Sequence, residues 1–562
     1  MVLIKYCKTV SHFSEGARAI IFQESGVNGS FLKISGLPLE SVLGFQSFFG
    51  GAPEIFIHLR NRTFMRTRSG LYVFKSLAAG LLTSQMLFSL QIYAANHKLY
   101  ERIKAMADAG YLVVPNEATA INLTGIDSAF YGALFFSLSV GAFLSLGALA
   151  GAWIWDRLGG RRRMVLNTLC LPWAACICAV NAKGFCPWIT AVFLAAPAVT
   201  FGVAIRWMPA EGLDRRRLAA AVLPAAILAG MWLSQMDAHM MIDIRDGLLL
   251  SNSLGRNIND FYYRYTLYPA EVFKSMNQKL IKTVGFDAGV KPALQAEIEK
   301  RLVDFDYLKM RHPALCDLWI RQAGGLLVLE HDSKSVVQTP VQTFFSQTSR
   351  IIAEFSEKTD RWPFYRRFTL TSVLIGLPVL CYMGIYGTAA MIARTLKSRH
   401  ASFWAAGVCL GAGVVLLAFF YASRPGDLDN DRIPDALGTS RPRNRVAALK
   451  TIARKNLEIA DYPVYAGLLS SEHAVERYWL VKCLGVSRKP ETLALIQNFL
   501  DDPQANVACM AFQALGRRGN SRSVEVIVSR IAGLRHGYVQ WYAYRALRSL
   551  GWRPAILMQK SS

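Results

Sequence analysis

The sequence lacks the short motifs by which many hydrolases, metalloproteases, nucleotidases and dehydrogenases are recognised. It contains no Gly-x-Ser-x-Gly elbow, no His-Glu-x-x-His, no phosphate-binding loop, no Cys-x-x-Cys-His and no dinucleotide fingerprint. These absences exclude the enzyme classes that use those motifs. The long apolar runs also contain almost no charge. Ion-coupled transporters and proton pumps usually keep ionisable side chains at membrane depth, so this second absence disfavours a transporter.

What the sequence does have is hydrophobicity. Of its 562 residues, 52% are hydrophobic and only 18% are charged, which indicates a membrane protein. A helix of about 20 apolar residues crosses a bilayer. Seven stretches are long enough to do so: 73–95, 128–155, 164–181, 187–206, 217–236, 368–394 and 402–422.

Basic clusters fall at alternate ends of these stretches, before the first and after the second, fourth and sixth. They comprise Arg60, Arg62, Arg66, Arg68, Arg157, Arg161, Arg162, Arg163, Arg206, Arg215, Arg216, Arg217, Arg394, Lys397 and Arg399. The positive-inside rule places these ends in the cytoplasm. Segments 96–127, 237–367 and 423–562 then lie outside, and we expect a multi-pass protein of a bacterial inner membrane. The clusters account for much of the formal charge of +24 without nucleic acid.

The N-terminal segment carries no cleavable signal pattern, because its apolar run at 19–22 is too short. Met65 stands directly before Arg66 and Arg68, which is an ordinary start for a signal anchor. Residues 1–64 are therefore either a small cytoplasmic extension or a mis-called start. The membrane bundle of the first five spans then covers residues 65–236.

A fixed repeat occupies the last quarter of the chain. Val446, Val475, Val507 and Val539 occur in similar segments and lie 29, 32 and 32 residues apart. Three of these segments run on to a Leu-Gly pair. A period of this size predicts stacked helical hairpins, because one hairpin cannot bury its apolar face alone. The pattern resembles short HEAT repeats of the type noted in phycobilisome lyases, over roughly residues 440–554. That resemblance implies protein binding.

An acidic linker, 423–439, separates the last span from the repeats. Its carboxylates occupy alternate positions of a calcium loop, with a carbonyl at position 7. The predicted ligands are Asp427, Asp429, Asp431, the Ile433 carbonyl and Asp435. The stretch resembles one thrombospondin type 3 repeat, although Arg432 replaces the expected glycine. The resemblance implies structural Ca²⁺ that stiffens the joint, and the alternative is a solvated linker.

The long outer loop, 237–367, begins with the best chemical constellation of the chain. Asp237 is followed by His239, Asp243 and Asp246, and the last three share one helical face. Such a cluster could bind a metal or act as acid and base. The alternative is capping and salt bridges with Arg245 or Arg256. The tyrosine-rich stretch 259–269 follows, and we favour an interfacial belt or a core for it over a ligand site.

The rest of this loop predicts a small, mostly helical domain with some strand. Residues 326–329 have the continuous apolar run of a buried strand, and 293–304 and 339–356 have helical patterns. Among the ten cysteines, Cys186 and Cys316 are the only pair that we would test for a bridge.

The repeat segment, 440–562, is basic and aromatic. Its candidate basic surface consists of Arg477, Lys482, Arg517, Arg518, Arg522, Arg545 and Arg548. A generic solvated face is the alternative to contact with an acidic protein or anionic head groups. Its aromatic residues, divided between core and surface, are Tyr478, Trp479, Tyr538, Trp541, Tyr542 and Tyr544.

The sequence therefore predicts a mainly α protein: a bundle of about seven spans, an outer loop domain and a C-terminal HEAT-like solenoid. The leading function is an outer platform for protein interaction or assembly. The second is a membrane enzyme acting on a lipid-linked or periplasmic substrate through His239, Asp243 and Asp246. A transporter is third.

Overall fold

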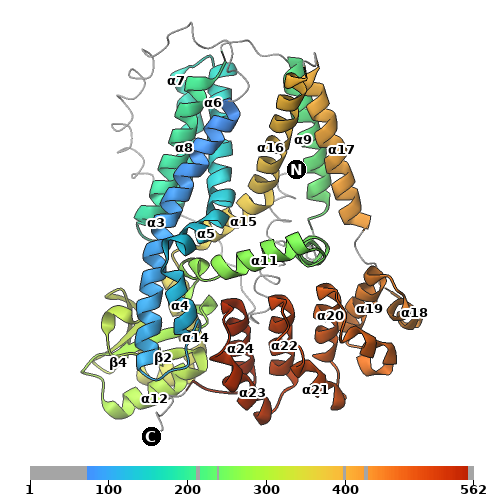
Figure 1. Ribbon diagram of the computed structural model, residues 1–562. Helices are drawn as coiled ribbons and strands as arrows, with labels where there is room; N and C mark the ends of the chain where they lie inside the picture. The colour runs from blue at the N-terminus through green and yellow to red at the C-terminus, as the bar shows by residue number, and fades with distance from the viewer. Residues whose placement is uncertain (1–71, 210–214, 237–239, 397–399, 423–427, 555–562) are drawn as a thin grey trace.

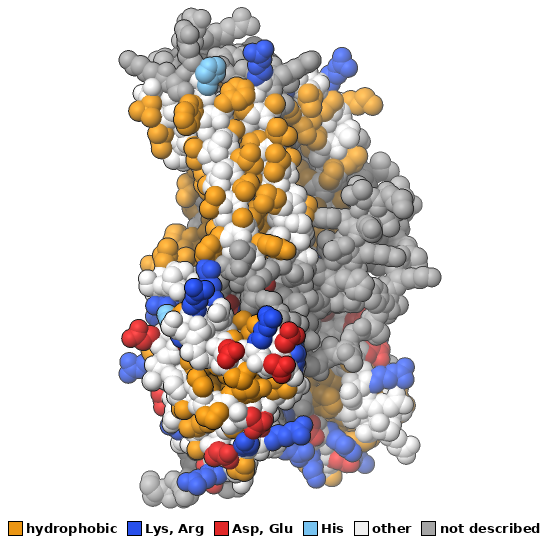
Figure 2. Space-filling view, turned by 90° about the vertical axis from the view of Figure 1, so that its right-hand side faces the viewer, with side chains coloured by type: hydrophobic (Ala, Val, Ile, Leu, Met, Phe, Trp, Pro, Cys, Tyr) orange, Lys and Arg blue, Asp and Glu red, His pale blue; other side chains and the backbone are white. Residues whose placement is uncertain are grey.

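The computed structural model describes residues 72–209, 215–236, 240–396, 400–422 and 428–554. Within them, six helices are long and apolar enough to cross a membrane. These are α3 (Tyr72–Asp108), α5 with α6 (Ile126–Phe136, Ala142–Arg157), α7 (Arg163–Asn181), α8 (Pro187–Trp207), α15 with α16 (Pro363–Thr371, Leu377–Thr395) and α17 (Ala401–Ala422). Figure 2 shows apolar side chains over the upper part of the molecule and charged side chains over the lower part.

The fifth predicted span, 217–236, corresponds to α9 (Arg215–Ser234). Its apolar part, Ala219–Ser234, is shorter than the other six, so six helices rather than seven meet the length of a span. Even so, α9 lies beside α16 and α17 (Figure 1). The Trp232 indole donates to the Leu374 carbonyl at 2.9 Å. This hydrogen bond holds α9 against the turn between α15 and α16.

Contacts at the helix ends show that the helices alternate in direction. Lys75 near the start of α3 lies over the ring of Trp207 at the end of α8, and Arg157 at the end of α6 donates to the Pro209 carbonyl. At the opposite end, the Lys183 ammonium in the α7–α8 turn donates to the Glu357 carbonyl of the loop domain at 3.4 Å. The loop domain and the repeats thus lie at the same end of the spans (Figure 1).

Helix α3 continues beyond the membrane part. Its 37 residues give a length of about 55 Å, against about 30 Å for the hydrocarbon core. Ile103 and Met106, near its end, are buried in the same hydrophobic core as the repeat helices. The end of α3 therefore belongs to the core of the repeats, while the rest of the helix packs among the candidate spans.

The loop domain is built on a five-stranded sheet of order β2-β1-β3-β4-β5. The strands are β1 (Lys282–Phe286), β2 (Tyr307–Lys309), β3 (Leu318–Ala323), β4 (Leu326–His331) and β5 (Lys334–Pro340). β1 pairs in parallel with β2 and β3, and β3, β4 and β5 pair antiparallel. The crossover α12 (Pro292–Leu302) and the helices α13 (Val341–Ser346) and α14 (Thr348–Thr359) share one buried core with the strands.

The loop domain has more helix than strand, as the sequence predicted, but its strands form one five-stranded sheet, which the sequence did not indicate. The predicted strand at 326–329 is present within β4, and the helices predicted at 293–304 and 339–356 are present as α12 and as α13 with α14. The other four strands have no apolar run as long as that of β4. The bridge considered between Cys186 and Cys316 is absent, since both are free thiols.

Short helices connect the spans to the sheet and the repeats. They are α4 (Glu117–Leu123), α10 (Met240–Ile244), the π-helical turn η3 (Arg245–Leu249), α11 (Ser253–Tyr265) and the 3-10 turn η4 (Pro269–Phe273). In Figure 1, α11 runs across the lower ends of the spans, directly above the repeats.

The C-terminal segment forms the predicted array of stacked helices. It contains α18 (Ile433–Gly438), α19 (Pro442–Lys455), α20 (Ala474–Leu484), α21 (Glu491–Gln497), α22 (Ala505–Arg518), α23 (Ser521–Ile531) and α24 (Gly537–Ser549). The first helices of the repeats, α19, α20, α22 and α24, pack side by side in that order. An ion pair of 2.7 Å between Arg445 and the fully buried Glu476 joins the first two repeats.

The Leu-Gly pairs allow this close stacking. A Cβ atom on Gly516 would lie only 2.8 Å from the Cα atom of Ala546 in α24, and one on Gly485 would lie 2.9 Å from the Cβ atom of Ala514. Neighbouring first helices therefore approach each other through these glycines. Gly551 has a different role, because its φ of +80° ends the last helix in the left-handed region.

We expect Gly516→Val to lower the free energy of unfolding by about 1–3 kcal/mol, the usual cost of overpacking. The better helix propensity of valine offsets only a fraction of that cost. Thermal melting of the detergent-solubilised chain measures the loss. Gly467→Val is the matched control, because a Cβ atom there meets nothing within 4 Å. Equal melting temperatures for the two variants would show that the close approach does not matter.

Candidate functional site

The array is docked on its own chain along its first helices. Their partners are α3, α4, η3, α11 and the part of the loop domain that contains the sheet, called the sheet domain below. The array shares one hydrophobic core with α3, α4 and the sheet domain. Polar contacts are spread along the whole docking surface, from Asp246 near the spans to Asp306 at the far end of the array. This docking surface is the main site that the structure assembles from distant segments.

Asp246 is the centre of the docking surface nearest α10. It is 7% exposed and forms ion pairs of 2.8 Å with both Arg245 and Lys450 of α19. Its second oxygen also accepts from the indole of Trp479 in α20 at 2.9 Å. The Arg245 guanidinium donates onward to the hydroxyl of Tyr478 at 2.7 Å. The first two repeats are thus fixed to the segment that leaves α9.

The electrostatics of Asp246 favour a fixed charge. Burial opposes its ionisation, but Arg245 and Lys450 outweigh burial and lower its pKa below the ordinary value. A carboxylate that is ionised and fully hydrogen-bonded is a poor general base at neutral pH, because its affinity for a proton is low. The arrangement is suited to holding two parts of the chain together.

Helix α11 carries the next contacts. The Asn259 amide donates to the side-chain oxygen of Asn506 in α22, and both residues are buried. The ring of Tyr263 stacks on that of Tyr538 with the centroids 3.8 Å apart. The predicted tyrosine-rich belt therefore supplies part of the docking surface.

His536 joins the start of α24 to α11. Its Nε2 lies 3.0 Å from the Asp260 carboxylate, and its Nδ1 accepts from the backbone N–H of Tyr538. Burial lowers the pKa of His536, and Asp260 only partly offsets that effect. The ring is therefore neutral at pH 7 and donates to Asp260 through Nε2.

Gln540 of α24 connects the array to α4. Its side chain is fully buried, accepts from the backbone N–H of Asn116 at 3.0 Å and donates to the hydroxyl of Thr119 at 3.0 Å. At the far end of α24, Arg548 forms an ion pair of 2.6 Å with Asp306 of the sheet domain. The last repeat is thus held at both ends.

The structure describes only two of the four residues of the predicted chemical cluster. Asp237 and His239 lie outside the described residues. Asp243 lies 3.5 Å from Lys450, and Asp246 forms the ion pairs above. The salt bridge to Arg245, which the sequence offered as the ordinary alternative, is present.

The residues that the sequence proposed for the surface of the array include both buried and exposed side chains. Tyr478, Trp479, Tyr542 and Tyr544 are buried, and Tyr538 and Trp541 are half-buried. Arg477 pairs with Asp502, and Arg518 donates to the carbonyls of Leu484 and Lys489. Lys482 and Arg545 lie over the rings of Trp479 and Trp541. Arg517 and Arg522 are exposed.

The predicted calcium ligands are only partly described. Asp427 lies outside the described residues, and Asp429, Asp431 and Asp435 are exposed. Ile433 begins α18, so its carbonyl lies within a helical turn. Among the described residues, no group of three or more His, Cys, Asp or Glu side chains could hold a metal ion. The three described carboxylates therefore do not form a site without further ligands.

Sequence reasoning missed Lys450, Asn506 and Gln540. Each is a polar residue on a repeat helix, and Asn506 and Gln540 have apolar neighbours and stand next to the aligned valines. A polar residue at such a position is a signal of a specific buried partner. The identity of that partner needed the structure.

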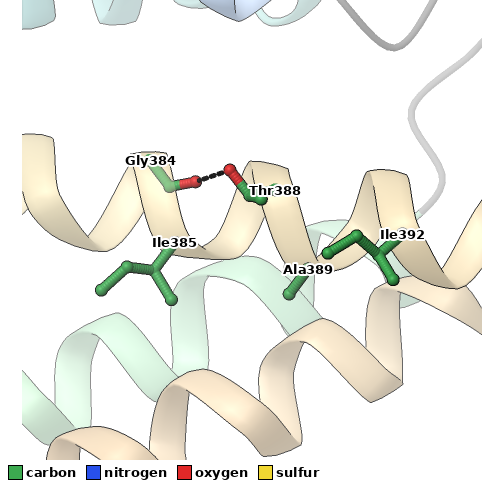
Figure 3. Close-up of a pocket in the computed structure, with 5 residues that line it drawn as sticks. All are labelled: Gly384, Ile385, Thr388, Ala389 and Ile392. Carbon is green, nitrogen blue, oxygen red and sulfur yellow. Dashed lines mark hydrogen bonds between the residues drawn. The ribbon is translucent and has the colours of Figure 1, made fainter.

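A shallow hollow lies on α16 and is lined by Gly384, Ile385, Thr388, Ala389 and Ile392 (Figure 3). The Thr388 hydroxyl donates to the Gly384 carbonyl at 2.8 Å within the same helix. Ile385 and Ile392 are half-exposed, and the hollow contains no charged group. It offers no chemistry beyond contact with an acyl chain.

The comparisons with known proteins give a match in the array alone. The family model for HEAT repeats matches residues 463–548. No curated protein and no solved structure matches the chain. HEAT repeats indicate protein interaction in general, and the structure extends the stack to α19, ahead of the matched residues.

Proposed function

We propose that this protein is a membrane-anchored platform that holds a HEAT array outside the bilayer and presents it to an acidic protein. One observation carries the proposal: the array is fixed to its own chain along its first helices, whereas the turns that follow α19, α20 and α22 form an open edge with exposed arginines. The basic clusters at the far ends of the spans support a cytoplasmic location for those ends and an outer location for the array.

The open edge is formed by the turns between the two helices of each repeat. Seven basic and three acidic residues occupy the turns 454–461, 485–491 and 516–522. Arg488, Arg517 and Arg522 are exposed there. We call these three arginines the basic ridge.

The position of the basic ridge favours a protein partner over the head groups of the same bilayer. The first helices meet α11 near their starts, and α22 is 14 residues, or about 21 Å, long. The ridge therefore lies about 20 Å below α11, whereas the Debye length is about 8 Å at physiological salt. Figure 1 shows α21 and α23 at the end of the array away from the spans.

A charge-reversal experiment tests this function. The variant Arg488→Glu/Arg517→Glu/Arg522→Glu and the wild-type chain would be crosslinked in their native membranes and purified. We expect an acidic protein that copurifies with the wild type to fall by about tenfold or more, because like charges facing each other cost several kcal/mol.

The matched control is Lys291→Glu/Arg311→Glu/Lys334→Glu, which reverses three exposed charges of the sheet domain. It should retain the partner. Loss with both triple variants would indicate nonspecific charge attraction. No loss with either would mean that the array only braces its own chain.

We further propose that Ca²⁺ binds the acidic linker as a weak structural ion. Three exposed carboxylates between positions 429 and 435 support it, with Asp427, water or a neighbour completing the site. Binding would fix the joint between α17 and α18, because calcium loops order the backbone that surrounds the ion.

Melting of the full chain with millimolar calcium or with chelator tests this proposal. Calcium should raise the melting temperature, since each tenfold excess over Kd adds about 1.4 kcal/mol. Asp429→Ala should abolish the rise, and Glu472→Ala, an exposed acid of the array, should keep it. A rise that survives Asp429→Ala, or no rise at all, would leave the stretch as a solvated linker.

A further inference from the structure

Helix α11 presents two opposite faces. Asn259 and Tyr263 point to the array, where they contact Asn506 and Tyr538. The other face is apolar and points toward the spans. It consists of Leu254, Ile258, Phe261, Tyr262 and Tyr265, which recur at helical spacing.

Aromatic contacts fix the direction of this apolar face. Phe261 and Tyr265 pack on Tyr131 with ring centroids 5.6 and 5.0 Å away, and Tyr262 packs on Phe135 at 5.3 Å. Both partners belong to α5, where the second span begins. The last two turns of α11 therefore lie directly under a membrane helix.

The first half of α11 extends beyond α5 and leaves its apolar side chains open. Leu254 is 69% exposed and Ile258 is 53% exposed, although they share the face that packs on α5. Two exposed aliphatic side chains that continue a face buried against a span need an apolar environment at the same level. A bilayer around the spans would supply that environment.

We infer that α11 lies in the membrane plane, with its apolar face in the boundary between head groups and acyl chains. Three features of the helix fit that location: its direction across the lower ends of the spans (Figure 1), its strong amphipathicity and its tyrosines. Exposed Asn257 and Arg264 lie on its flank, where head groups are within reach. The inference requires no protein partner.

One consequence concerns the array. Because its first helices are fixed to the opposite face of α11, the depth of α11 sets the height of the array above the bilayer. The array is then held at the membrane from both sides of one helix, by lipid on one face and by Asn259 and Tyr263 on the other.

Depth-dependent quenching tests the inference on the full chain, reconstituted in vesicles of phosphatidylcholine and phosphatidylglycerol. An environment-sensitive fluorescent amino acid would replace Ile258 or Leu254. Nitroxides would be carried by lipids either near the head group or near the end of the acyl chain. We expect shallow nitroxides to quench both positions at least about twofold more than deep ones, as for a helix buried about 5–10 Å below the surface.

Three reference positions make the outcome decisive. Deep nitroxides should quench the same probe at Val408 of α17. Neither kind of nitroxide should quench it at Lys334 of the sheet domain. At the flank position Asn257, quenching should be weaker than at Ile258. Quenching at Ile258 no stronger than at Lys334 would overturn the inference. A second result would also overturn it: the emission of the probe at Ile258 is blue-shifted, lipid nitroxides do not quench it, and dilution of the protein reverses the shift. A second copy of the chain would then cover this face.

Discussion

Asp246→Ala is expected to lower the free energy of unfolding of the docked array by about 3–5 kcal/mol, the usual cost of removing one partner from a buried ion pair. The variant leaves Arg245 and Lys450 facing each other with no carboxylate between them. It also leaves the Trp479 indole without its acceptor. The loss should be concentrated where η3 meets α19 and α20, because other contacts hold the last two repeats.

Hydrogen exchange of the full chain in detergent measures this local loss, and denaturant titration measures the total. Backbone amides of η3 and α20 should exchange faster, while those of α24 should change little. Glu525→Ala, an exposed acid on α23, is the control and should stay within about 0.5 kcal/mol of wild type. A double-mutant cycle with Lys450→Met isolates the Asp246–Lys450 coupling.

The same variant separates two functions. If Asp246 acted with His239 and Asp243 as acid and base, alanine would remove activity without loss of protein. If Asp246 holds the array to the rest of the chain, alanine lowers the free energy of unfolding and raises the local rate of hydrogen exchange. An Asp246→Ala chain that is as stable as wild type, with unchanged hydrogen exchange in α20, would contradict the docking role of Asp246 and favour the enzyme hypothesis.

The parts of the fold that the sequence predicted are those with a local pattern. Long apolar runs predicted seven spans, of which six are helices long and apolar enough to cross a membrane. The spacing of Val446, Val475, Val507 and Val539 predicted the four first helices of the array. The sheet had no comparable signal. β1 contains Lys282 and Gly285 within five residues, and it gains its two parallel neighbours only through pairing with distant segments.

The candidate site was predictable to a smaller degree. Asp246 stood out as an acid next to a span, but its partner Trp479 lies 233 residues further along the chain. Nothing in a single sequence indicates that one segment docks on the other. The composition of the array also suggested free surface where Tyr478, Trp479 and Arg548 are engaged by the chain itself. A repeat pattern predicts a stack but does not reveal what covers it.

The second large effect is expected at Asp317, which ties α3 to the sheet. It is 5% exposed, pairs with Arg102 of α3, and pairs with Lys279 at 3.0 Å. It also accepts from the backbone N–H of Thr283 at 3.1 Å. Asp317→Ala should therefore cost about 3–5 kcal/mol and loosen the end of α3 from the sheet.

The pH dependence of stability distinguishes this charge from a packing effect. Burial opposes ionisation of Asp317, but Arg102 and Lys279 outweigh it and hold its pKa well below the ordinary range. The unfolded chain then binds a proton that the folded chain does not, so this stabilisation is complete above about pH 5 and is lost as the pH falls further.

Asp317→Asn keeps the shape and removes the charge. The stability difference between wild type and Asp317→Asn should be constant from pH 7 to about 5 and should shrink by about 1.4 kcal/mol per pH unit below about 4. Urea titrations of the detergent-solubilised chain between pH 7 and 3 measure it. A difference that stays constant to pH 3 would mean that shape, and not charge, holds α3 to the sheet.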